Sequence, residues 1–124
     1  IGGGVCQVSS TLYNAILLAG LTPTARTSHA LPSAYCPPGL DATVADGQID
    51  LQFRNQLAHS VYLLTSADGH TLTVYILGTR ADLGGKTIRL VSNGSRFHPS
   101  VYRLYLAGDQ VIEREFLHTD SYAS

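Results

Sequence analysis

The sequence has little charge and few cysteines. Only 14% of its 124 residues are charged and the formal net charge is −1, which argues against an electrostatic nucleic-acid binder, because neutralising phosphates needs concentrated basic charge. No apolar run approaches the roughly 20 residues that span a bilayer. The longest run, residues 15–20, fits a buried helix. Two cysteines, Cys6 and Cys36, cannot form a disulfide scaffold and do not establish an oxidising compartment.

The sequence also lacks an initiator methionine and a signal sequence, and its first residues already form a glycine-rich motif. We therefore expect a fragment without its N-terminal part, so that targeting cannot be deduced directly. Hydrophobic residues make up 44% of the chain, enough for a core. The length fits a single domain over residues 1–124.

Two regions of this domain differ in pattern. Residues 1–44 are irregular apart from one predicted helix over residues 6–19, which ends at Gly20. Four prolines then keep the following segment extended or turning, so we predict loops there rather than regular elements. The helix is predicted to be buried on most sides, and one continuous apolar face is made by Val8, Leu12, Ala15, Ile16 and Ala19.

From residue 48 to residue 117 the sequence has the alternation of an antiparallel sheet. The predicted strands cover residues 49–54, 60–65, 71–77, 86–91, 100–106 and 110–117. The sequence therefore predicts an α+β fold, with one main N-terminal helix after a glycine-rich turn packed on a mostly antiparallel β-sheet. We expect the tail after Leu117 to be loosely ordered.

Cys6 stands where the glycine-rich turn leads into the predicted helix. Unpaired N–H groups and the helix dipole at that position favour a thiolate. The same N–H groups can receive the oxyanion that forms when a carbonyl is attacked, and glycines let the substrate approach closely. The position therefore suits a nucleophile for acyl transfer. The alternative is that Cys6 is a small, inert, buried residue.

A cysteine nucleophile needs a base and a group that orients the base. His29 and Asp41 follow Cys6 in an order that makes a triad plausible. As alternatives, His29 can simply hydrogen-bond its loop, and Asp41 can form a turn. Arg26 is a candidate for binding a substrate carboxylate, or else a structural ion pair. We interpret the remaining histidines as mainly solvated surface residues: His59, His70, His98 and His118.

The two cysteines have other conceivable uses. A disulfide between Cys6 and Cys36 would block the nucleophile, as an oxidised resting form or an artefact. A zinc site made of Cys6, His29 and Cys36 matches none of the compact zinc motifs, in which ligands come in close pairs. We therefore predict no metal and no cofactor.

These motifs together resemble the VanW domain. The resemblance is strong over residues 2–77 and weak beyond them, and it is carried by residues 2–15, 19–21, 26, 28–30, 35, 38–44 and 49–55. It implies a secreted or membrane-anchored bacterial protein of the cell envelope, from a family named after an accessory of glycopeptide-resistance clusters. Members are described as peptidoglycan L,D-transpeptidases, in which a cysteine attacks a tetrapeptide stem before its terminal D-Ala and a second stem resolves the acyl-enzyme as a 3-3 cross-link.

The resemblance implies that Cys6 is the nucleophile and that peptidoglycan stem peptides are the partners. Substrate binding is then expected at six positions: Gly3, Gly4, Gln7, Ser9, Arg26 and Tyr35. The chain departs from the family pattern at Ala30-Leu31 and at Cys36, and it lacks the sequence that normally precedes the glycines.

Two other functions remain open. One is a non-catalytic module that binds the cell wall through an aromatic surface of Tyr62, Tyr75, Tyr102 and Tyr105, although we expect these tyrosines rather to pack against the core with their hydroxyls in water. The other is a cysteine peptidase or amidase, which would use the same site with water as the acceptor.

Overall fold

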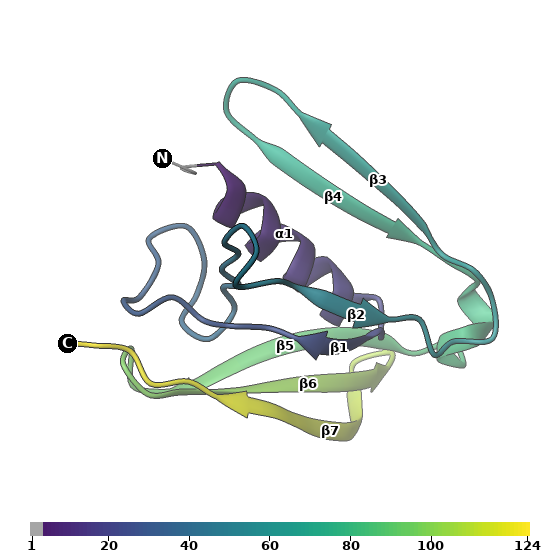
Figure 1. Cartoon of the computed structure of the whole chain (residues 1–124). Helices are drawn as coiled ribbons and strands as arrows, with labels where there is room; N and C mark the ends of the chain where they lie inside the picture. The colour runs from purple at the N-terminus through teal and green to yellow at the C-terminus, as the bar shows by residue number, and fades with distance from the viewer. Residues whose placement is uncertain (1–3) are drawn as a thin grey trace.

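The computed structural model describes residues 4–124 (Figure 1). It contains one α-helix, a short 3-10 helix and three small antiparallel sheets, and so confirms the α+β prediction. The sheets pair β1 with β2, β3 with β4, and β5 with β6 and β7. In chain order the elements are α1 (Val5–Leu18), β1 (Thr22–Ala25), β2 (Gln52–Arg54), β3 (Tyr62–Ala67), β4 (Leu72–Leu77), η1 (Arg80–Leu83), β5 (Thr87–Gly94), β6 (Pro99–Ala107) and β7 (Gln110–Thr119).

Helix α1 begins after the glycines and ends before Gly20, as the sequence predicts. Gly20 has a φ of +80°, which lets the chain reverse into β1. The predicted apolar face is wrong in part, because Val8 is 46% exposed. The residues of α1 that are buried are Ser9, Ser10, Tyr13, Ile16 and Leu17. Two of them are serines, which a hydrophobic periodicity cannot place on the buried side of a helix.

Strand β6 is the centre of the three-stranded sheet and ties that sheet to α1. Its Val101 joins the hydrophobic core with Tyr13 and Leu17 of the helix. The buried Arg103 donates hydrogen bonds to the carbonyls of Leu17 and Leu21, at 3.0 and 2.9 Å. It thus connects the last turn of α1 and the residue that precedes β1 to the three-stranded sheet.

The β3–β4 hairpin lies apart from the three-stranded sheet (Figure 1). Strand β4 packs against α1, whereas β3 is exposed along its whole length. The turn is made by Asp68, whose Oδ1 accepts the N–H groups of His70 and Thr71, both at 2.7 Å. This is the turn chemistry that the Asp-Gly sequence predicts.

Two predictions about order are wrong. Residues 22–25 form strand β1, which pairs with β2, where the prolines predicted only loops. The tail after Leu117 is not loose, because β7 continues to Thr119 and both Asp120 and Tyr122 are buried. Backbone hydrogen bonds from Asp120 to Pro99 and from Tyr122 to Phe97 hold this tail. Within residues 4–124, no helix has the length and apolar character needed to cross a membrane.

Candidate functional site

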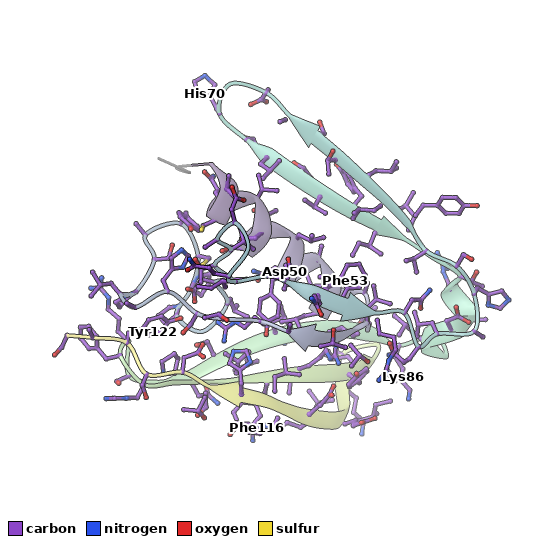
Figure 2. The ribbon with its side chains drawn as sticks, in the orientation of Figure 1. Asp50, Phe53, His70, Lys86, Phe116 and Tyr122 are labelled. Carbon is purple, nitrogen blue, oxygen red and sulfur yellow. The ribbon has the colours of Figure 1, made fainter. Side chains whose placement is uncertain are left out.

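The candidate site lies between the first turn of α1 and the long connection from β1 to β2. The helix provides Cys6, and the connection provides His29, Asp41 and Thr43. The end of the chain reaches the same region, and Figure 2 shows Tyr122 beside the loops that follow β1. Residues far apart in the sequence are therefore brought together here.

Serine side chains of α1 fasten the connection to the helix. Ser10 Oγ accepts the N–H of Ala42 at 2.9 Å and lies 3.1 Å from its carbonyl. Ser9 Oγ donates to the same carbonyl at 2.5 Å, and Asn14 donates to the carbonyl of Leu40 at 2.8 Å. These bonds hold the backbone of Leu40 and Ala42 against the helix. They therefore determine where the side chains of Asp41, between them, and Thr43, after them, lie.

The thiol of Cys6 is half-buried and has polar partners. Its sulfur lies 3.3 Å from the hydroxyl of Thr43 and 3.7 Å from the carbonyl of Val44. The hydrogen bond with Thr43 does most to lower the pKa of this thiol, and His29 lowers it further. Gly4, the N-cap of α1, has no side chain to occupy the free N–H groups of the first turn. This surrounding favours a thiolate over an inert, buried thiol.

An open pocket of about 970 Å³ lies against Cys6. Its walls are Val5 and the segment 44–50, which includes the carboxylates of Asp46 and Asp50. The sulfur of Cys6 therefore has an open space beside it.

His29 and Asp41 are paired in the manner of a base and its orienting group. His29 Nδ1 lies 2.6 Å from Asp41 Oδ2, and the backbone N–H of His29 donates to the same oxygen at 2.7 Å. Burial, the largest single effect, would lower the pKa of His29, but Asp41 and Cys6 together outweigh burial and the pKa is raised. Burial would raise the pKa of Asp41, yet the donors around it hold that pKa below its usual value. The pair therefore leaves His29 Nε2 for proton transfer.

Asp41 is only 1% exposed and belongs to a larger buried network. Its Oδ1 accepts hydrogen bonds from the hydroxyl of Tyr122 and, at 3.3 Å, from Arg26. Arg26 also donates to Asp120 at 2.7 Å and to the carbonyl of Gly39 at 3.1 Å. Because these partners occupy the guanidinium of Arg26, the geometry favours the structural ion pair over the binding of a substrate carboxylate.

Several groups of this network were missed by the sequence prediction. His118 is not a solvated surface residue, since its ring lies 2.8 Å from the carbonyl of Gly39 and 3.3 Å from the hydroxyl of Tyr13. Asp120 and Tyr122 follow the last strand with no motif to mark them. Thr43 and Val44 belong to the motif of residues 38–44 that contains Asp41. Membership of that motif is the signal in the sequence that could have assigned them to the site.

The other predicted substrate-binding residues have different surroundings. Gly3 lies outside the described residues, and Gly4 is the N-cap of α1. Gln7 is exposed near Cys6. Ser9 is buried with its hydroxyl bonded to backbone carbonyls, which gives it a structural role. Tyr35 is exposed, and its hydroxyl lies 3.5 Å from His29 Nε2.

Cys6 and Cys36 are both free thiols. Burial raises the pKa of the Cys36 thiol, the opposite of the shift at Cys6. No group of three or more His, Cys, Asp or Glu side chains within residues 4–124 is arranged to hold a metal ion. The two cysteines thus differ in character, and Cys6 is the one whose surroundings favour reactivity.

The order and spacing of these residues coincide with a known family. Residues 1–77, more than half of the chain, match the model described as VanW like protein. The chain belongs to the VanW-like family. The match includes Cys6, His29 and Asp41, but it ends before the strands β5, β6 and β7 and before the tail.

Two curated relatives support the VanW-like assignment. The uncharacterized protein YoaR of Bacillus subtilis (strain 168) is 43% identical over 74 residues, which cover 60% of this chain and 24% of that protein. The vancomycin B-type resistance protein VanW of Enterococcus faecalis (strain ATCC 700802 / V583) is 29% identical over 99 residues, which cover 76% of this chain and 35% of that protein. The chain thus spans about a quarter to a third of these relatives. No solved structure gives a significant match.

Proposed function

We propose that this VanW-like chain is a cysteine acyltransferase of the L,D-transpeptidase type, which forms 3-3 cross-links between peptidoglycan stem peptides. The observation that carries the proposal is the arrangement of Cys6 with its lowered thiol pKa, His29 and the buried Asp41. The resistance function in the name of one relative agrees with an action on the cell wall. Such a substrate places the protein outside the cytoplasm, in the bacterial cell envelope.

The first half of the proposed reaction makes a thioester. The Cys6 thiolate attacks the carbonyl carbon that precedes the terminal D-Ala, and the carbonyl oxygen becomes an oxyanion. The free N–H groups in the first turn of α1 are the donors available to that oxyanion. As the C–N bond breaks, His29 gives its proton to the leaving nitrogen, and D-Ala departs as an amine.

The second half returns the enzyme to its starting state. The side-chain amine of another stem attacks the thioester and transfers a proton to His29. A new C–N bond forms, the C–S bond breaks, and the Cys6 thiolate faces a protonated His29 again. Asp41 stays ionised throughout, since its lowered pKa suits a group that orients the imidazole and stabilises its charge.

The decisive experiment looks for the acyl-enzyme. The protein is incubated with a muropeptide that carries a tetrapeptide stem, and the intact mass is measured. We expect an adduct equal to the stem minus D-Ala, which is lost in Cys6→Ala because the attacking sulfur is gone. Cys36→Ala is the matched control and should keep the adduct, since Cys36 has a raised thiol pKa and lies outside the proposed reaction.

Further outcomes separate the alternatives. Adding acceptor stems should convert the adduct to a cross-linked product, whereas release of the tripeptide stem alone would assign a peptidase or amidase. If reduced Cys6 gives no adduct and the protein still binds cell wall after Cys6→Ala, the transpeptidase proposal is wrong and a non-catalytic binding module replaces it.

A further inference from the structure

We propose that residues 120–123 are a positioning element for the Cys6–His29–Asp41 site, and that Tyr122 is its positioning residue. The inference rests on the proposed function only for the role of these three residues. Its observable consequence, the reactivity of the Cys6 thiol, does not require a substrate. The element lies outside the part of the chain that the family model matches.

The hydroxyl of Tyr122 joins two groups of the site. It donates a hydrogen bond to Asp41 Oδ1 and accepts the backbone N–H of Gly39 at 3.0 Å. Tyr122 is 5% exposed and Asp41 is 1% exposed, so water cannot replace this contact freely. Burial of Tyr122 raises the pKa of its phenol, which keeps the hydroxyl protonated and able to donate.

The contact with Tyr122 completes the hydrogen bonding of the Asp41 carboxylate. Oδ2 receives both the backbone N–H and the ring of His29, while Oδ1 receives Tyr122 and the longer bond from Arg26. A carboxylate held at both oxygens cannot rotate, and its plane then fixes the direction of the His29 ring. Without the hydroxyl, only Arg26 at 3.3 Å would restrain Oδ1.

Asp120 and Ala123 of the element bind the β1–β2 connection on either side of His29 along the chain. Asp120 pairs with Arg26 at 2.7 Å, and the N–H of Ala123 donates at 2.8 Å to the carbonyl of Ala30, the residue after His29. The backbone of Tyr122 is itself tied to Phe97. The contacts on Arg26, Asp41 and Ala30 thus bracket His29 along the chain, which is the arrangement expected of a positioning element rather than of a loose end.

The test compares Tyr122→Phe with Tyr62→Phe. Both substitutions remove one phenolic oxygen, but Tyr62 is 70% exposed and lies on β3, which provides none of the site residues. The rate at which iodoacetamide alkylates Cys6 is measured against pH, with peptide mass spectrometry separating Cys6 from Cys36. In Tyr122→Phe we expect the midpoint of the alkylation profile to move about half a pH unit higher, because a less restrained His29 stabilises the thiolate less. Below the midpoint, the fraction of Cys6 present as thiolate should then fall roughly threefold. Tyr62→Phe should match the parent protein.

A merely structural role for Tyr122 would lower the unfolding midpoint without moving the alkylation midpoint, and that result in a folded variant would overturn the proposal. If Tyr122→Phe does not fold, Asp120→Asn provides the test, with a smaller shift expected in the same direction. An unshifted profile in that variant would also overturn it. A shifted profile in a protein that forms no acyl adduct would refute the acyltransferase proposal and leave the positioning element intact.

Discussion

The hydrogen bond with the hydroxyl of Thr43 is the largest single cause of the lowered pKa of the Cys6 thiol. This hydroxyl lies 3.3 Å from the sulfur, and it must act as the donor once the thiol has lost its proton. Thr43 is itself fixed by its backbone N–H, which donates to the carbonyl of Thr27 at 2.8 Å. At the scale of single residues, the thiolate is therefore stabilised by a neutral donor as well as by the charge of His29.

Thr43→Val tests this donor, because valine keeps the shape of threonine and removes the hydroxyl. We expect the pKa of Cys6 to rise and alkylation of Cys6 near neutral pH to slow by roughly threefold to tenfold, since a net hydrogen bond of about 1 kcal/mol is lost. Thr24→Val on the exposed part of β1 is the matched control. Equal alkylation rates in Thr43→Val and the parent protein would contradict the assignment.

Part of the site could be predicted from the sequence. Cys6, His29 and Asp41 were singled out from the glycine-rich turn and the order of the residues, and the structure places them in one region. Tyr122 and Asp120 could not be found in this way. Their contacts with Asp41 and Arg26 join positions 81 and 94 residues apart, and no local pattern encodes such a separation.

Among the elements, the turn at residues 37–40 decides how Asp41 enters the site. Gly39 in this turn has a φ of +87°, and a Cβ there would lie 2.5 Å from the side chain of Val101 on β6. The carbonyl of Gly39 accepts from Arg26 and lies 2.8 Å from the ring of His118. Glycine is therefore required at this position both for the backbone conformation and for the close approach to the sheet.

Gly39→Ala should destabilise the protein more than Gly47→Ala. Both glycines have positive φ, +87° and +69°, but nothing lies within 4 Å of the position where the Cβ of residue 47 would stand. The conformational cost is shared, so the difference isolates the contact with Val101, which we expect to cost about 1–3 kcal/mol. Urea unfolding measures it. Equal free energies of unfolding for the two variants would show that β6 yields to the added methyl group.

The regular elements were predicted with mixed success, for physical reasons. The helix and the six later strands follow from hydrophobic alternation and turn residues, and they are observed with shifts at their ends. Strand β1 was missed because Pro23 cannot donate to a ladder, although it can stand on a short two-stranded sheet. The buried face of α1 was misplaced because Ser9 and Ser10 are buried by bonding to Ala42, which no apolar pattern reports.

Across the whole molecule, a buried charge cluster links the β1–β2 connection to the tail after β7. Arg26 faces the carboxylates of both Asp41 and Asp120. Burial would raise the pKa of each carboxyl, but hydrogen bonds outweigh it and both values are lowered. Carboxyls with a lowered folded-state pKa stabilise the folded protein above their unfolded pKa, and this stabilisation is lost as the pH falls through the folded value.

The protein should therefore lose stability in acid, below the ordinary carboxyl pKa of 3.8. The free energy of unfolding in urea, measured from about pH 6 down to about pH 2, records this loss. In Asp120→Asn the free energy of unfolding should fall less steeply as the pH is lowered, because one of the two carboxyls no longer binds a proton there. Asp109→Asn changes the net charge equally on the exposed β6–β7 turn, and its free energy of unfolding should fall as steeply with pH as that of the parent protein. An equally steep fall in Asp120→Asn would show that the Asp120 carboxyl does not contribute to the loss of stability in acid.

The contact between Tyr122 and Asp41 also affects when the site can form during synthesis. A ribosome releases Cys6 and His29 long before residues 120–123, and domains begin to fold from the end made first. The hydroxyl that restrains Asp41 arrives only after all the strands have been made, 81 residues later. A nascent or prematurely ended chain would then carry the cysteine without its fully aligned histidine. Synthesis of residues 120–123 would then be the step that completes the alignment of His29 beside the thiol.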